Sequence, residues 1–205
     1  MAYTLGSEPA GAVVPMVELK IVVAGGFGVG KTTMVATLSE IPPLTTEEIL
    51  TDVSRGIDDL TGVTNKTTTT VAMDFGRITF ADPPRPMILF LFGTPGQERF
   101  WFAWPDLSYG AVGAVVLADT RRLEDSFAAV SYFEQLETPF VVAVNEFDGA
   151  YRYTPDEVRQ ALELAPGVPV LPCDVRQRAS AMTVVIRLVE HSLQRRRHLI
   201  SGALA

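Results

Sequence analysis

A glycine-rich loop that follows an apolar segment is the feature that most limits what this chain can fold into. Residues 21–24 are apolar, and residues 25–32 then match the pattern G-x-x-x-x-G-K-[ST] without a gap. Residues 33–39 have helical character, so the motif lies between a buried strand and a helix. This order predicts phosphate binding, because glycines let successive N–H groups surround phosphate oxygens at a helix N-terminus. A chance glycine loop between a strand and a helix is the alternative.

Individual positions of this loop have different expected roles. Lys31 is expected to reach the terminal phosphates of a nucleotide, and the Thr32 hydroxyl is expected to ligate Mg²⁺. The residues predicted to contact the nucleotide here are Gly25, Gly26, Phe27, Gly28, Val29, Gly30, Lys31, Thr32 and Thr33.

The composition suits a single folded domain that is not built to bind nucleic acid. Of the 205 residues, 47% are hydrophobic, which is enough for a full core, and the net charge is −7. An acidic chain lacks the basic face that binds a phosphate backbone, so no nucleic acid partner is expected. We expect a flexible tail over residues 1–15, one domain over 16–198 and a second tail over 199–205.

Targeting signals are not evident in the chain. No apolar run is long enough to span a bilayer, and the N-terminus lacks the features of a signal peptide. The single cysteine, Cys173, excludes an internal disulfide and is compatible with a reducing compartment. We therefore expect a cytoplasmic protein without direct membrane insertion, which a partner recruits to a membrane if it is recruited at all.

Strand-like and helix-like segments alternate along the chain. The expected strands are residues 17–24, 71–80, 87–92, 111–118, 140–144 and 168–171. The expected helices are residues 33–39, 45–50, 123–136, 154–164 and a last helix from a cap at Ser180 to the end of the domain. The alternation predicts an α/β fold, a doubly wound, mostly parallel six-stranded sheet with helices on both faces. Binding residues should then lie at the carboxyl ends of the strands.

Polar motifs follow or precede several of the expected strands. The threonine run 67–70 precedes the second strand, residues 93–97 follow the third, residues 145–148 follow the fifth, and residues 173–175 follow the last. Together with the phosphate loop, these motifs resemble those of small Ras-like GTPases, in the same order. The resemblance extends from residue 17 to about residue 193. It is closest to the bacterial type encoded in actinobacterial conservon operons, and more distant to the bacterial gliding-motility GTPase.

The resemblance implies a Ras-like domain that binds GTP and GDP with Mg²⁺. Thr70 would contact the metal and the γ-phosphate, and Thr69 and Thr67 are the alternatives for this role. The backbone N–H of Gly96 would contact the γ-phosphate. In catalysis, Gln97 would orient the attacking water and Lys31 would stabilise the charge of the phosphates.

The last two motifs would bind the base. A carboxylate accepts hydrogen bonds only, and guanine offers two adjacent donors where adenine offers an acceptor, so Asp148 would select guanine. The resemblance places Asn145 beside it, and Cys173, Asp174 and Val175 in the loop around the base. The Val175 N–H would contact the guanine oxygen, whereas the Cys173 thiol is expected to be buried rather than reactive.

Several positions depart from the family pattern. Gly93 occupies the place of an aspartate on the Mg²⁺ side, and Asp74 is one candidate to replace it. Glu146 replaces a lysine that packs over the base, which should weaken nucleotide affinity. Phe27 replaces a small residue that faces the γ-phosphate, so its ring is expected to make a close steric contact with Gln97.

These departures leave more than one function open. The first hypothesis is a slow GTPase switch whose partner is a small roadblock-type protein in a sensor-kinase pathway, as the resemblance implies. The second is a nucleotide-dependent scaffold with little or no hydrolysis. The third is a P-loop NTPase or kinase that uses ATP, although residues 91–119 show no arginine-rich lid. An aromatic cluster of Phe100, Trp101, Phe102 and Trp104 fits either the core or a partner surface.

Overall fold

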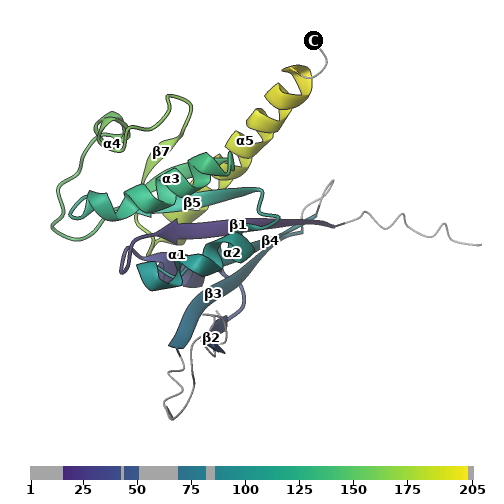
Figure 1. Ribbon diagram of the computed structural model, residues 1–205. Helices are drawn as coiled ribbons and strands as arrows, with labels where there is room; N and C mark the ends of the chain where they lie inside the picture. Colours follow the sequence, from purple (N-terminus) through teal and green to yellow (C-terminus); the bar gives the residue numbers. More distant parts are fainter. Residues whose placement is uncertain (1–15, 43, 51–68, 82–85, 203–205) are drawn as a thin grey trace, which may run out of the picture.

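A single β-sheet organises the chain, with helices on both of its faces (Figure 1). The computed structural model describes residues 16–42, 44–50, 69–81 and 86–202. Over these ranges the sheet has seven strands in the order β2-β3-β4-β1-β5-β6-β7. The strands are β1 Val17–Gly25, β2 Leu44–Leu50, β3 Thr69–Phe80, β4 Met87–Gly93, β5 Gly113–Ala118, β6 Phe140–Asn145 and β7 Val170–Cys173. The helices are α1 Lys31–Leu38, α2 Trp104–Ser108, α3 Phe127–Gln135, α4 Pro155–Ala161 and α5 Arg178–Gly202, with 3-10 turns η1 Glu98–Ala103 and η2 Leu123–Ser126.

The sheet is mostly parallel, which confirms the predicted α/β, doubly wound fold. Strands β4, β1, β5, β6 and β7 are parallel neighbours, whereas β3 is antiparallel to both β4 and β2. Because parallel strands all point the same way, the loops after β1, β4, β5, β6 and β7 emerge at one edge. The predicted binding motifs therefore meet at this edge.

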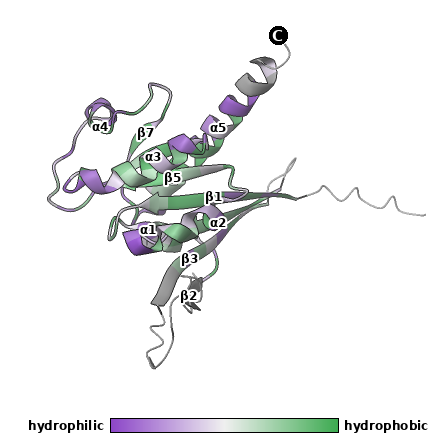
Figure 2. Ribbon diagram, viewed as in Figure 1, coloured by the Kyte–Doolittle hydropathy of each residue, from purple (hydrophilic) through white to green (hydrophobic). Residues whose placement is uncertain are grey.

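Two apolar layers hold the helices against the sheet. Along β1, Ile21 and Val23 pack in the layer under α1 and α5, while Val22 and Ala24 pack in the layer under α3 and α4. All of them are fully buried, which explains why the strand reads as an unbroken apolar run rather than an alternating one. Figure 2 shows apolar residues concentrated along the central strands, and both polar and apolar residues along the helices.

Some local predictions were wrong. Residues 45–50 were expected to form a helix, but they lie in β2, which pairs antiparallel with β3. Pairing with a neighbouring strand overrides such a weak local preference, and it adds a seventh strand to the six that were expected.

The last helix also differs from its prediction. α5 begins at Arg178 rather than at a Ser180 cap, and the Ser180 hydroxyl instead accepts a hydrogen bond from the Asp174 N–H at 3.0 Å. The helix continues to Gly202, past the expected domain end at residue 198. The described parts of the chain contain no helix with the length and apolar character of a membrane span.

Candidate nucleotide-binding site

The glycine-rich loop has a backbone conformation that requires its glycines. Gly25, Gly28 and Gly30 have φ angles of 135°, 74° and 107°, a region that other residues rarely adopt. A Cβ at Gly25 would also lie 2.5 Å from the Leu117 carbonyl oxygen of β5. The loop joins β1 directly to α1, so the predicted strand–loop–helix context of the motif is confirmed.

Lys31 lies inside this loop. Its side chain is 8% exposed, and Nζ donates to the carbonyl oxygens of Gly25 at 2.9 Å and Gly26 at 2.6 Å. Burial lowers the pKa of Lys31 to about 8, although the nearby charge of Asp74 acts in the opposite direction. A buried ammonium held by two carbonyl groups is placed to neutralise a phosphate that enters the loop.

The predicted metal side of the site contains a carboxylate. Thr32 Oγ1 donates to Asp74 Oδ2 at 2.7 Å, and Asp74 is buried. Asp74 lies directly opposite Gly93 in the β3–β4 pairing, and a Cβ at Gly93 would be 3.0 Å from both Cβ and Oδ2 of Asp74. Asp74 therefore fills the space that a side chain at position 93 would take.

The first-switch threonines are only partly placed by the structure. Thr70 lies in β3 opposite Ile49 of β2, and Thr69 is the first residue of that strand. Their side-chain positions and all of Thr67 lie outside the described residues. Within the described part of the chain, no cluster of three or more His, Cys, Asp or Glu residues is present that would hold a metal without further ligands.

The second-switch segment packs closely on the phosphate loop. A Cβ at Gly96 would lie 2.6 Å from Lys31 Nζ and 2.9 Å from Phe27 Cα, so only glycine fits there. Gln97 accepts a hydrogen bond from Arg99 Nε at 2.9 Å. An open cavity of about 550 Å³ lies between the second-switch segment and the phosphate loop. The phenylalanine ring at position 27 is 63% exposed at the border of this cavity, which Gln97 also lines.

One buried polar atom in this cavity has no partner. Thr94 lines the cavity, and its Oγ1 is buried without a hydrogen-bond partner among the described residues. Native proteins rarely leave such a group unsatisfied, so the cavity is suited to a polar ligand or water.

The aromatic cluster after this segment is divided between core and surface. Phe100 and Trp104 are buried, whereas Trp101 and Phe102 are 36% and 60% exposed. The Trp104 Nε1–H donates to the Pro95 carbonyl oxygen at 3.1 Å, which ties the buried indole to the second-switch segment. Phe100 and Trp104 therefore belong to the core, whereas Trp101 and Phe102 lie at the surface, where a partner surface stays a prediction.

Asn145 connects the base motifs to the phosphate loop. Its Nδ2 donates to the Val29 carbonyl oxygen at 2.9 Å, and its Oδ1 accepts from the Val175 N–H at 3.3 Å. Asn145 is 5% exposed, so both contacts lie in the interior. The structure thus brings together three of the predicted motifs, and the Val175 N–H that was expected to contact a base is bonded to this asparagine.

Asp148 is paired with an arginine that the sequence analysis did not identify as a site residue. Arg176 donates from Nη1 to Asp148 Oδ2 at 2.9 Å and from Nη2 to Oδ1 at 3.1 Å, and its Nε donates to Asp174 Oδ1 at 2.9 Å. These hydrogen bonds lower the pKa of Asp148 and hold the pKa of Asp174 at about 2. Both carboxylates are therefore ionised at neutral pH.

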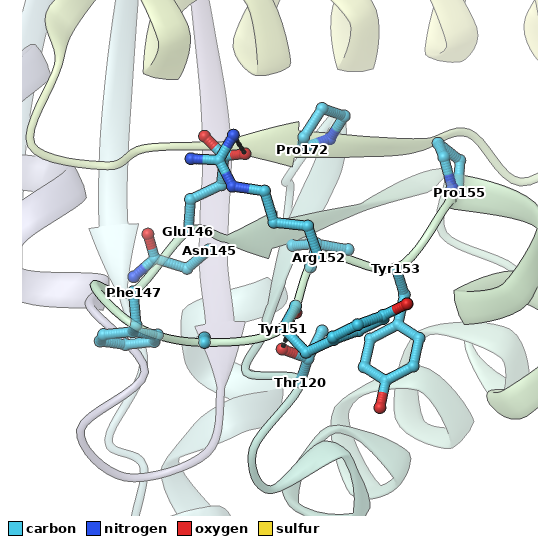
Figure 3. Close-up of a pocket in the computed structure, with 11 residues that line it drawn as sticks. Thr120, Asn145, Glu146, Phe147, Tyr151, Arg152, Tyr153, Pro155 and Pro172 are labelled. Carbon is cyan, nitrogen blue, oxygen red and sulfur yellow. Dashed lines mark hydrogen bonds and ion pairs between the residues drawn. The ribbon is translucent and has the colours of Figure 1, made fainter.

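Cys173 and Glu146, which also belong to the base motifs, have contacts within the protein. The Cys173 thiol is fully buried, and burial raises its pKa to about 11, so it is neutral and unreactive as expected. Glu146 forms an ion pair with Arg152 at 3.3 Å. Figure 3 shows this pair in a small neighbouring pocket, beside the adjacent rings of Tyr151 and Tyr153.

A glycine loop with a buried lysine, at the carboxyl edge of a doubly wound sheet, defines a nucleotide-binding protein of the phosphate-loop class. The family model described as "Conserved hypothetical ATP binding protein" matches residues 23–195, and the chain belongs to this family. A search of curated proteins finds no match.

Proposed function

We propose that the protein is a guanine-nucleotide switch that hydrolyses GTP slowly. The observation that carries this proposal is the position of Asp148 just beyond β6, three residues after Asn145, which ends this strand and whose amide bonds the phosphate loop at Val29. A base held by Asp148 would then have its phosphates directed toward Lys31. An ionised carboxylate pairs with the adjacent N–H groups of guanine and repels the ring acceptor of adenine.

The residues around the phosphate loop support a role for Mg²⁺. The Thr32 hydroxyl and the Asp74 carboxylate supply hard oxygen donors, which are the ligands that Mg²⁺ prefers. We propose that these two residues hold the ion together with nucleotide phosphates and water, and that Thr70 joins them from β3. Bound Mg²⁺ would neutralise charge on the terminal phosphates.

The remaining catalytic roles fall to groups of this chain. Lys31 would offset the charge of the β- and γ-phosphates, and the Gly96 N–H would contact the γ-phosphate. Gln97 would leave its hydrogen bond with Arg99 to orient the attacking water. The need for this rearrangement, and the close contact of Gly96 with the loop, support slow turnover.

Two further hypotheses have observations in their favour. The family description names ATP, which supports an ATP-binding protein as the second candidate. The bond between Gln97 and Arg99 supports a scaffold that binds nucleotide without hydrolysing it. A phosphate-release assay at saturating GTP or ATP separates hydrolysis from binding alone.

The proposed partner is a roadblock-type protein in a sensor-kinase pathway, and the proposed location is the cytoplasm. The exposed Trp101 and Phe102, which follow the second-switch segment, offer an apolar surface for this partner.

The first prediction tests the choice of base. The wild-type protein should bind GTP at least about tenfold more tightly than ATP, because guanine offers two donors that can replace Arg176 on the Asp148 carboxylate, whereas adenine offers an acceptor there. Asp148→Asn replaces one acceptor oxygen with a donor, and xanthine presents a carbonyl where guanine has its amino group. The variant should therefore lose affinity for GTP and gain affinity for the xanthine nucleotide, without gaining ATP.

Competition binding with these three nucleotides measures the ranking. Asp156→Asn is the matched control, since Asp156 is an exposed carboxylate on α4 that pairs with Arg159 rather than with a residue of the base motifs. A wild-type preference for ATP, or an unchanged ranking in Asp148→Asn, would show that Asp148 does not select the base.

A further inference from the structure

Arg122 contacts the phosphate loop from a different part of the chain. Its Nη2 donates to the Phe27 carbonyl oxygen at 3.0 Å, although 95 residues separate the two in sequence. The same guanidinium lies 4.0 Å from the buried Asp119 carboxylate at the end of β5 and 3.6 Å from Asp125 in η2. A Cβ at Gly28 would lie 3.7 Å from Nη2, so the arginine lies against the middle of the loop.

This contact fixes the direction of one peptide group. A trans peptide is planar, so the Phe27 carbonyl and the Gly28 N–H point in opposite directions. The two preceding carbonyls, of Gly25 and Gly26, point to Lys31, whereas the Phe27 carbonyl points to Arg122. Holding that carbonyl toward Arg122 directs the Gly28 N–H to the other side of the loop.

We propose that Arg122 is a positioning residue for phosphate binding, which acts through the Phe27–Gly28 peptide. A cation on the carbonyl polarises the peptide and makes its N–H a stronger donor. The Gly28 N–H would then bind an oxygen of the β-phosphate, since backbone N–H groups of such loops cradle the phosphates. The contact thus places a positive charge behind the phosphate loop, on the side opposite to the Gly28 N–H.

The effect on hydrolysis follows from where charge develops, and this part rests on the proposed function. When water attacks, a bond forms between its oxygen and the γ-phosphorus, and the bond from that phosphorus to the bridging oxygen breaks. The electron pair of the broken bond remains on the bridging oxygen, which leaves with the β-phosphate, and the water proton passes to the released phosphate. A stronger donor at the β-phosphate therefore stabilises the transition state more than the bound substrate.

A plain surface ion pair is the competing explanation, and two variants separate it from the proposal. Asp125→Asn removes one charged partner of Arg122 but keeps the arginine and its carbonyl contact. Arg187→Ala removes an exposed arginine that forms a similar pair with Glu190 on α5, far from the loop. A role in ion pairing alone predicts that Asp125→Asn resembles Arg122→Ala.

The experiment measures the Kd of the diphosphate, GDP or ADP, that the wild-type protein binds more tightly. By calorimetry, Arg122→Ala should raise this Kd about three- to tenfold, the size expected for one ordinary net hydrogen bond, because Arg122 acts through the peptide and does not touch the phosphate. Arg122→Lys should restore part of the affinity, and Arg187→Ala should stay within about twofold of wild type. Asp125→Asn removes a negative charge beside Gly26 of the loop, so it should leave the affinity unchanged or raise it, and it should not raise the Kd. In single-turnover hydrolysis of the matching triphosphate, the rate of Arg122→Ala should fall by a larger factor than its Kd rises.

The proposal is overturned if Arg122→Ala binds diphosphate within twofold of wild type, or if Asp125→Asn has the same effect as Arg122→Ala. A wild-type protein that hydrolyses neither triphosphate contradicts the proposed GTPase activity, and the diphosphate affinities then decide the role of Arg122 by themselves. Thermal unfolding of each variant verifies that it is folded, and Arg122→Lys provides a second reading if the alanine variant is not.

Discussion

Nucleotide affinity should fall as the pH rises through about 8, because Lys31 loses its charge there. Burial lowers the pKa of Lys31 from 10.5 to about 8 in the free protein. A bound phosphate favours the ammonium, so the complex keeps this proton at a pH where the free protein has lost it. Binding above pH 8 therefore requires the uptake of a proton, and the affinity decreases with rising pH.

The magnitude follows from the fraction of Lys31 that is charged before binding. With a pKa of about 8, roughly nine tenths of the free protein carries the ammonium at pH 7 and roughly one tenth at pH 9. The Kd should therefore be about tenfold higher at pH 9 than at pH 7. An ordinary surface lysine would give almost no change over this interval.

Calorimetry with GDP between pH 6.5 and 9 measures how the Kd depends on pH. Repeating the titration in buffers with different ionisation heats gives the number of protons taken up on binding. Asp74→Asn is the informative variant, since the charge of Asp74 raises the pKa of Lys31 and its loss should move the midpoint to lower pH. Lys20→Arg is the control, because burial also lowers the pKa of Lys20, which bonds the Tyr109 carbonyl away from the site.

The ionisation of GDP itself is identical in every variant, so the shift between variants reports on the protein. A Kd that is constant from pH 7 to 9 would refute the reasoning. An unchanged midpoint in Asp74→Asn would assign the dependence to another group.

Two further predictions concern the second-switch segment. Gly96→Ala should weaken GTP-analogue binding and destabilise the protein by about 1–3 kcal/mol, because its methyl group would lie 2.6 Å from Lys31 Nζ. Denaturant unfolding measures the loss of stability. Unchanged stability and binding would show that the segment has room for the methyl group. Tryptophan fluorescence should differ between the GDP and GTP-analogue states, since Trp104 bonds the Pro95 carbonyl. Trp104→Phe should remove most of that difference and Trp101→Phe should retain it; identical spectra at full occupancy would contradict a moving segment.

The parts of the fold that the sequence predicts well are those in which local pattern and burial agree. Residues 21–25 of β1 and all of β5 are buried on both faces, so their composition alone identifies them as central strands. The helix predicted over residues 154–164 is found as α4, and its capping box, with Thr154 and Glu157 bonded to each other, depends only on residues close in sequence. β2 was not predicted as a strand, because its strand conformation depends on pairing with β3. The pattern of residues within β2 does not indicate that it has this partner.

The same distinction applies to the site. The glycine loop and Lys31 were predicted because the motif is contiguous and each position has its own physical requirement. Arg176 and Arg122 were missed, since they meet their partners across 28 and 95 residues of sequence. The available signal was weak: each arginine lies near an aspartate at the end of a strand, which is common on any surface. Only the topology of the sheet brings these arginines to Asp148 and to the loop.

The relation between Asp74 and Gly93 shows how a motif can lose a residue while the site keeps its chemistry. Directly opposed residues of antiparallel strands project their side chains to the same face of the sheet. A carboxylate on β3 at position 74 therefore reaches the region that a carboxylate on β4 at position 93 would reach, and the 3.0 Å approach leaves space for only one of them. The glycine at position 93 is then a steric requirement of the aspartate at position 74. The departure from the family pattern, taken alone, is a weak argument against metal binding, because the bond from the Thr32 hydroxyl to Asp74 keeps a carboxylate next to the phosphate loop.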